Sequence, residues 1–386
     1  MAGNIQILSY SVRFRVVCKY LGQFALLIGA LTTVPLAVSL LYGELRISVR
    51  YGAVLALLAL LGLPLARLRA PRDVQPNESM CLAALLFLLT PLIMSYPMMG
   101  AGIDFPDALF ESISGATTTG LTTLSSVESM PRSFLFARAW MQWYGGLGIV
   151  VFSLALVVRP GLAAKGLAFA EGTEDDTVGG TRSFARLVLL IYVSISAMGV
   201  WLLLLLGAGG FNAVVYALAA VSTGGFSPHS GSLADFGGLP VHAAVILLCL
   251  CGAIPLSFYY MRRQRNWART ANALQAKAIV LLGLAGILLV GFSMWLGSEK
   301  TVLEVLGQAS FMALSAQTTA GFSTLNTAEL AADTKLFLML SMAIGGGIGS
   351  TAGGIKVMRL LILLRIIQLA LVRTRLARHA VYKPTL

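Results

Sequence analysis

Apolar residues fall in long uncharged runs, and these runs decide the class of fold. Seven are clear in the sequence: 20–42, 51–66, 80–101, 139–158, 187–210, 239–261 and 278–297. A helix that crosses a bilayer needs about 20 residues, so most of these runs are long enough, whereas 51–66 needs its flanks to complete a crossing. Because backbone groups cannot stay unpaired in lipid, each run is predicted to be a transmembrane helix.

Three shorter apolar stretches lie between the long runs, at 105–116, 211–221 and 302–317. Each is too short to span a bilayer and suits a half-helix that enters the membrane and stops. Each also has a long apolar run before it and another after it. A unit of helix, half-helix, polar loop and helix is therefore predicted to occur three times.

A polar motif follows each half-helix. Thr117-Thr118-Thr119-Gly120-Leu121-Thr122 recurs as Ser222-Thr223-Gly224-Gly225-Phe226-Ser227 and again as Thr318-Thr319-Ala320-Gly321-Phe322-Ser323. The glycines near the centre of the motif, Gly120, Gly225 and Gly321, are 105 and 96 residues apart. A single copy would be read as a Ser/Thr/Gly turn. Three copies in matching surroundings favour a functional element.

The chemistry of this unit suits a cation filter. The half-helix enters from outside, so its partially negative C-terminal end points at the motif. Carbonyl oxygens of the loop can then replace the hydration shell of an ion. Glycine admits backbone angles that a side chain forbids, while Thr and Ser add oxygen atoms without a competing charge.

Composition and charge agree with a membrane protein. Hydrophobic residues make up 57% of the chain and charged residues 11%, where a soluble domain carries about a quarter charged residues. If the N-terminus is cytoplasmic, 22 of the 28 Lys and Arg residues lie inside, which is the positive-inside asymmetry. The net charge of +12 is therefore a topology signal and not a sign of nucleic-acid binding. Of the 16 acidic residues, 10 lie outside, where negative charge concentrates cations.

Other chemistry is weakly represented. The four cysteines, Cys18, Cys81, Cys249 and Cys251, lie in or beside apolar runs and have no metal-binding spacing. The apolar runs contain no pair of acids, no nucleophile with a base and no metal cluster, so an enzyme is disfavoured. The first apolar run is too long for a signal peptide. The aromatic residues Trp140, Trp143 and Tyr144 are expected to pack or to anchor at an interface.

The chain resembles the Trk/Ktr potassium-uptake proteins, which are TrkH-like and have plant HKT relatives. The segments that carry the resemblance are 110–120, 142–149, 222–229, 317–323 and 345–356. It implies an all-α integral membrane fold, with two N-terminal helices followed by helix–pore-helix–helix repeats around a pseudo-fourfold pore. The corresponding division is an N-terminal region 1–78 and pore repeats 79–183, 184–271 and 272–386, the last with a glycine-rich break and a basic C-terminal segment.

The same resemblance implies potassium uptake across the cell (inner) membrane by a multi-pass protein with a cytoplasmic N-terminus. The transported ion is K⁺ and no cofactor is expected. The family's filter role falls on Thr118, Thr119, Gly120, Thr223, Gly224, Gly225, Thr319, Ala320 and Gly321. A filter glycine in every repeat goes with potassium preference, and serine in the first repeat goes with sodium-permeable plant relatives. Expected partners are membrane lipid, a second copy in a homodimer and a cytosolic nucleotide-binding regulatory subunit, with no nucleic acid.

The segment 345–356 has six glycines among its first ten residues. Glycine costs about 1 kcal/mol per helix position relative to alanine, so a continuous helix is not expected. By resemblance this is a gate under the filter; close helix packing through small residues is the alternative. The gate residues are Gly345, Gly346, Gly347, Gly349, Ser350, Thr351, Gly353, Gly354 and Lys356. An unpaired charge is costly at bilayer depth, so Lys356 is expected to face a wet cavity or the cytoplasm.

The sequence departs from the family at its C-terminal end. Leu386 follows a segment that resembles the linker into a fourth repeat, so the fourth filter strand is expected to be missing. A fragment is the first interpretation, and a second polypeptide that supplies the repeat is another. A degenerate, non-conducting subunit or a sodium-permeable relative are further alternatives. The basic segment 365–378 is interpreted as a helix that leaves the membrane towards anionic lipid, with a docking surface for a regulatory subunit as the other possibility.

Overall fold

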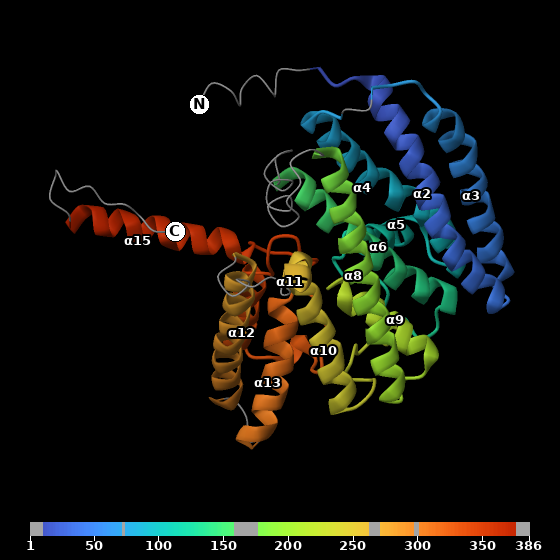
Figure 1. The fold of residues 1–386 in the computed structure, drawn as a ribbon. Helices are drawn as coiled ribbons and strands as arrows, with labels where there is room; N and C mark the ends of the chain where they lie inside the picture. Colours follow the sequence, from blue (N-terminus) through green and yellow to red (C-terminus); the bar gives the residue numbers. More distant parts are fainter. Residues whose placement is uncertain (1–10, 72–73, 158–176, 262–270, 297–300, 376–386) are drawn as a thin grey trace.

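The structure is a computed structural model that describes residues 11–71, 74–157, 177–261, 271–296 and 301–375. Over these residues the chain is helical apart from its loops and one isolated bridge between Ile344 and Ile355. The prediction of an all-helical membrane protein is confirmed (Figure 1). The elements are α2 (Phe14–Leu41), α3 (Leu45–Ala66), α4 (Pro76–Met98), η1 (Met99–Ala101), α5 (Phe105–Ala116), α6 (Arg132–Val157), α8 (Thr177–Leu205), α9 (Gly210–Val221), α10 (Leu239–Ala253), α11 (Leu256–Met261), α12 (Ala271–Leu296), α13 (Val302–Gln317), η3 (Thr327–Glu329), α14 (Ala332–Ala343) and α15 (Val357–Arg375).

Five of the described helices, α2, α3, α4, α8 and α12, are long and apolar enough to cross a membrane. Their outward faces carry large apolar side chains. On α12, for example, Leu281, Leu288 and Phe292 are 60–67% exposed. An apolar surface of this extent is typical of contact with lipid, because water would oppose it.

Helix α3 begins upstream of the apolar run that predicted it. It starts at Leu45 and has 22 residues. Its first two turns contain Arg46 and Arg50, which lie outside the uncharged run 51–66. Arg50 Nη1 donates a hydrogen bond to the backbone oxygen of Tyr96 (2.9 Å), and its guanidinium lies over the Tyr96 ring. The charged flank therefore completes the crossing, as the short run required.

The prediction of one continuous helix over 239–261 is wrong. Helix α10 ends at Ala253, Ile254 is extended, and α11 starts at Leu256. Pro255 causes the break, because proline lacks an N–H and pushes the preceding residue out of the helical region. A count of apolar residues alone does not detect this interruption.

The predicted interruption after α14 is present. The chain leaves the helix at Ile344 and enters α15 at Val357. Gly349 and Gly354 have positive φ angles of 75° and 66°, which an α-helix does not contain. The isolated bridge between Ile344 and Ile355 closes the base of the excursion.

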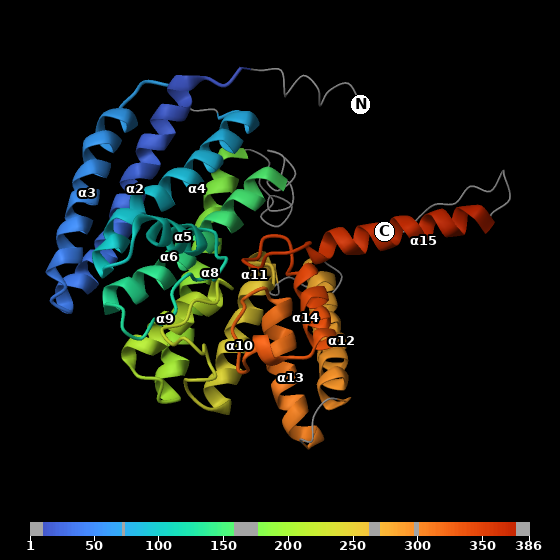
Figure 2. The same cartoon turned by 180° about the vertical axis from the view of Figure 1, so that it is seen from behind.

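Each of the three helices that precede a motif lies between the helix before it and the helix after it in the chain (Figures 1 and 2). Helix α5 packs against α4 and α6, α9 against α8 and α10, and α13 against α12 and α14. The main hydrophobic core surrounds α9, in which eight residues are buried. The hairpin of α2 and α3 packs on α4 and α6. Figure 2 shows α15 leaving the bundle across the direction of α12.

Candidate functional site

The three motif copies form loops with the same backbone conformation at the C-terminal ends of α5, α9 and α13. We call them motif loop 1 (117–122), motif loop 2 (222–227) and motif loop 3 (318–323). In each loop a threonine and the second residue after it have positive φ. The angles are 55° and 78° for Thr118 and Gly120, 51° and 81° for Thr223 and Gly225, and 56° and 81° for Thr319 and Gly321. A left-handed non-glycine residue costs roughly 1–2 kcal/mol, so its recurrence at equivalent positions is a specific structural feature.

The loops also make the same hydrogen bonds to their half-helices. In motif loop 1, the amides of Thr117, Thr118 and Thr119 donate to the carbonyls of Ile113, Gly115 and Ser114 at 2.8–3.0 Å. The equivalent amides of motif loops 2 and 3 bond to the equivalent carbonyls of α9 and α13. Alternating backbone conformations make successive amides converge on one side. Here that side is the end of the half-helix.

The motif loops lie next to one another in chain order. A Cβ atom on Gly120 would overlap the carbonyl oxygen of Gly224, and one on Gly225 would overlap the carbonyl oxygen of Ala320. A Cβ atom on Gly321 would meet no described atom within 4 Å. The structure therefore brings the nine predicted filter residues together as three adjacent segments, with motif loop 2 in the middle.

The glycine-rich segment (345–356) lies against the threonines at which motif loops 2 and 3 begin their turn. The Thr351 hydroxyl donates to the carbonyls of Val221 and Gly252, both at 3.0 Å, and lies 3.3 Å from the Thr223 hydroxyl. The amide of Gly353 donates to the Thr319 hydroxyl at 2.7 Å. Residues predicted for the filter and for the gate are thus in direct contact.

Two further predicted gate residues, Gly347 and Gly349, anchor this segment to the break between α10 and α11. The amides of Gly347 and Leu256 donate to the carbonyls of Ala253 and Gly349 at 3.0 and 3.1 Å. Backbone groups that are freed at one broken helix therefore pair with those freed at the other, which is how an interruption is tolerated at membrane depth. Within the segment, Gly345, Gly346, Gly347, Gly349, Ser350 and Thr351 are buried, whereas Gly353 and Gly354 are exposed.

Lys356 ends the segment half-buried. Its ammonium group turns back and donates to the carbonyls of Ser350 and Ala352. The charge is thus solvated by the carbonyls of the segment itself, which the sequence did not indicate.

Sequence reasoning missed the side chains that support the motif loops. Gln142 of α6 donates from Nε2 to the Gly224 carbonyl (2.6 Å) and accepts from the Phe226 amide at Oε1 (3.1 Å). Glu111 of α5 and Arg138 of α6, which the topology count placed among the outer charges, form a buried ion pair (2.8 Å). Glu111 and Gln142 lie in two of the segments that carry the family resemblance, 110–120 and 142–149, but only the fold shows that their side chains point towards the motif loops.

The loops that follow motif loops 1 and 2 are also linked. Glu128 accepts hydrogen bonds from the amide and the hydroxyl of Ser230 at 2.5 and 2.6 Å. The Ser230 hydroxyl, followed by its amide, lowers the pKa of Glu128 to about 2. This carboxylate therefore stays negative at any physiological pH and adds to the predicted negative charge outside.

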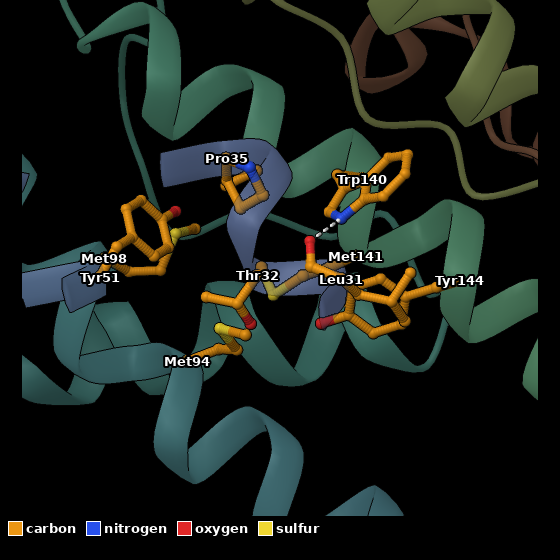
Figure 3. Close-up of a pocket in the computed structure, with 10 residues that line it drawn as sticks. Leu31, Thr32, Pro35, Tyr51, Met94, Met98, Trp140, Met141 and Tyr144 are labelled. Carbon is orange, nitrogen blue, oxygen red and sulfur yellow. Dashed lines mark hydrogen bonds between the residues drawn. The ribbon is translucent and has the colours of Figure 1, made fainter. Parts of the chain in front are cut away.

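The small pocket among the N-terminal helices does not compete as the site. The pocket in Figure 3 measures about 10 Å³ and lies among α2, α3, α4 and α6. It has room for about one water molecule. Its polar contact is structural: the indole N–H of Trp140 donates to the Leu31 carbonyl (2.9 Å). Trp143 likewise donates to the Ser196 hydroxyl (2.8 Å), so both tryptophans pack as expected. No group of three potential metal ligands occurs among the described residues.

Comparison with known proteins places the chain in a family. The model of the TrkH cation transport proteins matches residues 89–383. The Trk system potassium uptake protein TrkH of Halomonas elongata is 28% identical over 363 residues, which cover 91% of this chain and 75% of that protein. An uncharacterized cation transporter of Methanocaldococcus jannaschii is 29% identical over 351 residues, with 89% and 70% covered.

A solved structure has the same fold. The potassium transporter TrkH from Vibrio parahaemolyticus superimposes with a TM-score of 0.82 at 24% identity, over 97% of this chain and 79% of that one. Members of the matched family are transporters and not enzymes. With a family model matched over residues 89–383, a shared fold and several membrane-spanning helices, the chain belongs to the TrkH family of cation transport proteins.

Proposed function

We propose that this protein takes up potassium across the cell membrane, through a pore whose filter is built from the backbone of the three motif loops. The observation that carries the proposal is the geometry of these loops. They share one backbone conformation, follow three half-helices and lie side by side. The names of the Halomonas and Vibrio relatives, which are potassium transporters, support the choice of ion.

The ion would be held by backbone oxygens. Carbonyls of Thr118, Thr119 and Gly120, with their counterparts in motif loops 2 and 3, would replace the water around K⁺. The partially negative ends of α5, α9 and α13 would stabilise the charge. All three filter positions hold glycine, and none holds the serine that goes with sodium-permeable relatives in the first repeat. Potassium is the transported ion in this scheme, and no cofactor takes part.

The glycine-rich segment would act as the gate. It lies beneath motif loops 2 and 3 and is bonded to Thr223 and Thr319. In that position it obstructs the path of an ion that leaves the filter towards the cytoplasm. The arrangement with the hydrogen bonds of Thr351 and Gly353 in place would be the closed one. Displacement of the segment would break these bonds and open the path.

The repeats would surround one pore axis. Residues 1–78 form the N-terminal helix pair, and 79–183, 184–271 and 272–386 form the pore repeats. The open side next to Gly321 is where a further filter strand would sit. The N-terminus is cytoplasmic and the membrane is the inner one. A homodimer and a cytosolic nucleotide-binding subunit are the partners that fit such a transporter, and both belong to the proposal.

Complementation tests this function. The protein is expressed in a bacterial strain that lacks its own potassium uptake, and growth is followed at limiting potassium. Uptake of rubidium, a potassium tracer, is measured in the same cells. We expect growth and tracer uptake that excess potassium inhibits more strongly than excess sodium. Protein that reaches the membrane but supports neither growth nor uptake would contradict the proposal and favour a non-conducting subunit.

A further inference from the structure

The proposed pore leaves three buried polar side chains beside the motif loops without a role: Glu111, Arg138 and Gln142. We propose that these residues hold motif loops 1 and 2 in position and thereby set the discrimination between potassium and sodium. They are positioning residues, because they contact the filter backbone and not the ion. This inference rests on the proposed function.

Glu111 supports the strand that leaves motif loop 1. It lies on half-helix α5 and is fully buried. Its Oε1 atom accepts hydrogen bonds from the Thr122 hydroxyl (2.5 Å) and the Thr123 amide (3.1 Å). Its Oε2 atom accepts from Arg138 Nε (2.8 Å). Both carboxylate oxygens are therefore used, one on the loop and one on the arginine.

Arg138 extends this support to motif loop 2. Its side chain is 2% exposed. The guanidinium carbon lies 3.9 Å from the centre of the Phe226 ring, and Nη1 is 3.4 Å from the Ser227 carbonyl. A guanidinium over an aromatic face is attracted by the ring, and more strongly when both groups are desolvated. One buried ion pair thus contacts residues that lie one to three positions after the filter glycines of two different loops.

Gln142 holds motif loop 2 on either side of Gly225, through its bonds to the Gly224 carbonyl and the Phe226 amide. It lies four residues after Arg138, so both side chains project from the same face of α6. Gly145 is on that face as well, and a Cβ atom there would overlap the Ala116 carbonyl at the end of α5. Helix α6 therefore fits closely between the two loops and fixes their separation.

The three loops are not supported alike. The position of Glu111, seven residues before the left-handed threonine, holds Tyr216 in the second copy and Met312 in the third. The Tyr216 hydroxyl bonds to that of Ser227 (2.9 Å), which parallels the bond of Glu111 to Thr122. A methionine thioether offers no equivalent bond. The side chain at this position therefore makes a charged hydrogen bond in motif loop 1, a neutral one in motif loop 2 and no equivalent one in motif loop 3.

The choice of a buried ion pair points to positioning and not to stability. Replacing a buried pair by apolar residues of similar volume is often neutral or stabilising, so packing alone does not require it. A fixed geometry of the motif loops gives a reason for the ion pair, because selectivity depends on the placement of carbonyl oxygens around the ion. Loss of the pair should therefore change the preference between ions more than it changes the fold.

The test compares Glu111→Gln with Glu78→Gln. The control, Glu78, is also a buried carboxylate, and it pairs with Arg13 (2.7 Å), whose side chain is 36% exposed, at the other end of the bundle and away from the motif loops. The double variant Glu111→Gln/Arg138→Gln is included, because it leaves no unpaired charge if the single variant folds poorly. The full-length proteins are reconstituted in vesicles, and the apparent Km values for K⁺ and Na⁺ are measured together with melting temperature.

We expect both filter-side variants to lower the preference for potassium over sodium, measured as the ratio of the two apparent Km values, by about tenfold. A tenfold change corresponds to about 1.4 kcal/mol. The control should lower the melting temperature and keep the wild-type ratio. If the wild type passes potassium while both filter-side variants keep its ratio, the positioning role is wrong. If the wild type itself passes no potassium, the proposed function fails and the selectivity role falls with it.

Discussion

Threonine occupies a strained left-handed position in all three motif loops, where glycine would cost less. Its hydroxyl gives a reason in the second and third loops. The hydroxyl of Thr223 contacts Thr351, and that of Thr319 accepts the Gly353 amide. Glycine in place of threonine would relieve roughly 1–2 kcal/mol of backbone strain but would remove the contact with the glycine-rich segment. The strain is therefore retained at the points where motif loops 2 and 3 meet the glycine-rich segment.

The first prediction concerns the filter glycine of motif loop 1. Gly120→Ser adds a Cβ atom that would overlap the Gly224 carbonyl and requires a left-handed serine. Gly321→Ser carries the same backbone cost but meets no described atom. We therefore expect Gly120→Ser to lower the potassium-to-sodium uptake ratio by about tenfold and Gly321→Ser to lower it less. Competition of sodium with rubidium uptake measures both. Equal ratios in Gly120→Ser and wild type would contradict the filter assignment.

The second prediction explains the double glycine of motif loop 2. A Cβ atom on Gly224 would occupy the space of the Gln142 amide, whereas the third copy has Ala320 at this position. We expect Gly224→Ala to destabilise the protein by about 1–3 kcal/mol, because Gln142 must move. The reverse change in the third loop, Ala320→Gly, should cost about 1 kcal/mol or less. Thermal unfolding in detergent measures the difference, and equal costs would show that Gln142 does not constrain the loop.

Two interrupted helices stabilise each other in this fold. Pro255 breaks the run that contains α10 and α11, and glycines break the run that contains α14 and α15. The freed amides and carbonyls of one break bond to those of the other. An interruption in either helix alone would leave polar groups unpaired in an apolar environment, at a cost of several kcal/mol. The pairing also keeps the glycine-rich segment close to the motif loops.

The third prediction separates a gate from a packing surface. Thr351→Val removes the hydroxyl that bonds to Val221 and Gly252. If the segment is a gate, weaker attachment should raise potassium flux by about fivefold, because a hydrogen bond contributes about 1 kcal/mol. If the segment only packs, the same change should lower flux.

Ser350→Ala is the control for this change, since the Ser350 hydroxyl bonds only within the segment, to Gly347 among the described residues. Vesicle flux at equal protein content gives the sign. Shortening the segment over 348–352 should raise flux further while the protein level stays normal. Reduced flux in both Thr351→Val and the shortened protein would favour the packing explanation.

For the protein as a whole, the predicted topology places 22 of the 28 Lys and Arg residues on the cytoplasmic side of the membrane. The fourth prediction tests that orientation. A single cysteine at Arg69, between α3 and α4, should be protected from a membrane-impermeant thiol reagent in intact cells. A cysteine at Ser125, after motif loop 1, should react. The protein with only its four native cysteines gives the background, and labelling at position 69 in intact cells would reverse the topology.

Sequence alone determined the class of the fold and the composition of the candidate site. Uncharged apolar runs have few alternatives to membrane helices, because lipid leaves no other partner for the backbone. A motif that recurs three times after short helices identifies the loops, and six glycines in ten residues identify the break after α14. These features are local, so they can be read from neighbouring residues.

Tertiary structure decided how those parts meet. Glu111, Arg138 and Gln142 look like ordinary polar residues in the sequence, and only the packing of α6 against α5 and α9 makes them supports of the motif loops. The backbone groups at the break beside Pro255 find their hydrogen-bond partners in a segment about ninety residues later in the chain. Hydrogen bonds and close approaches between distant segments depend on the relative placement of whole helices, which local patterns of polarity do not specify.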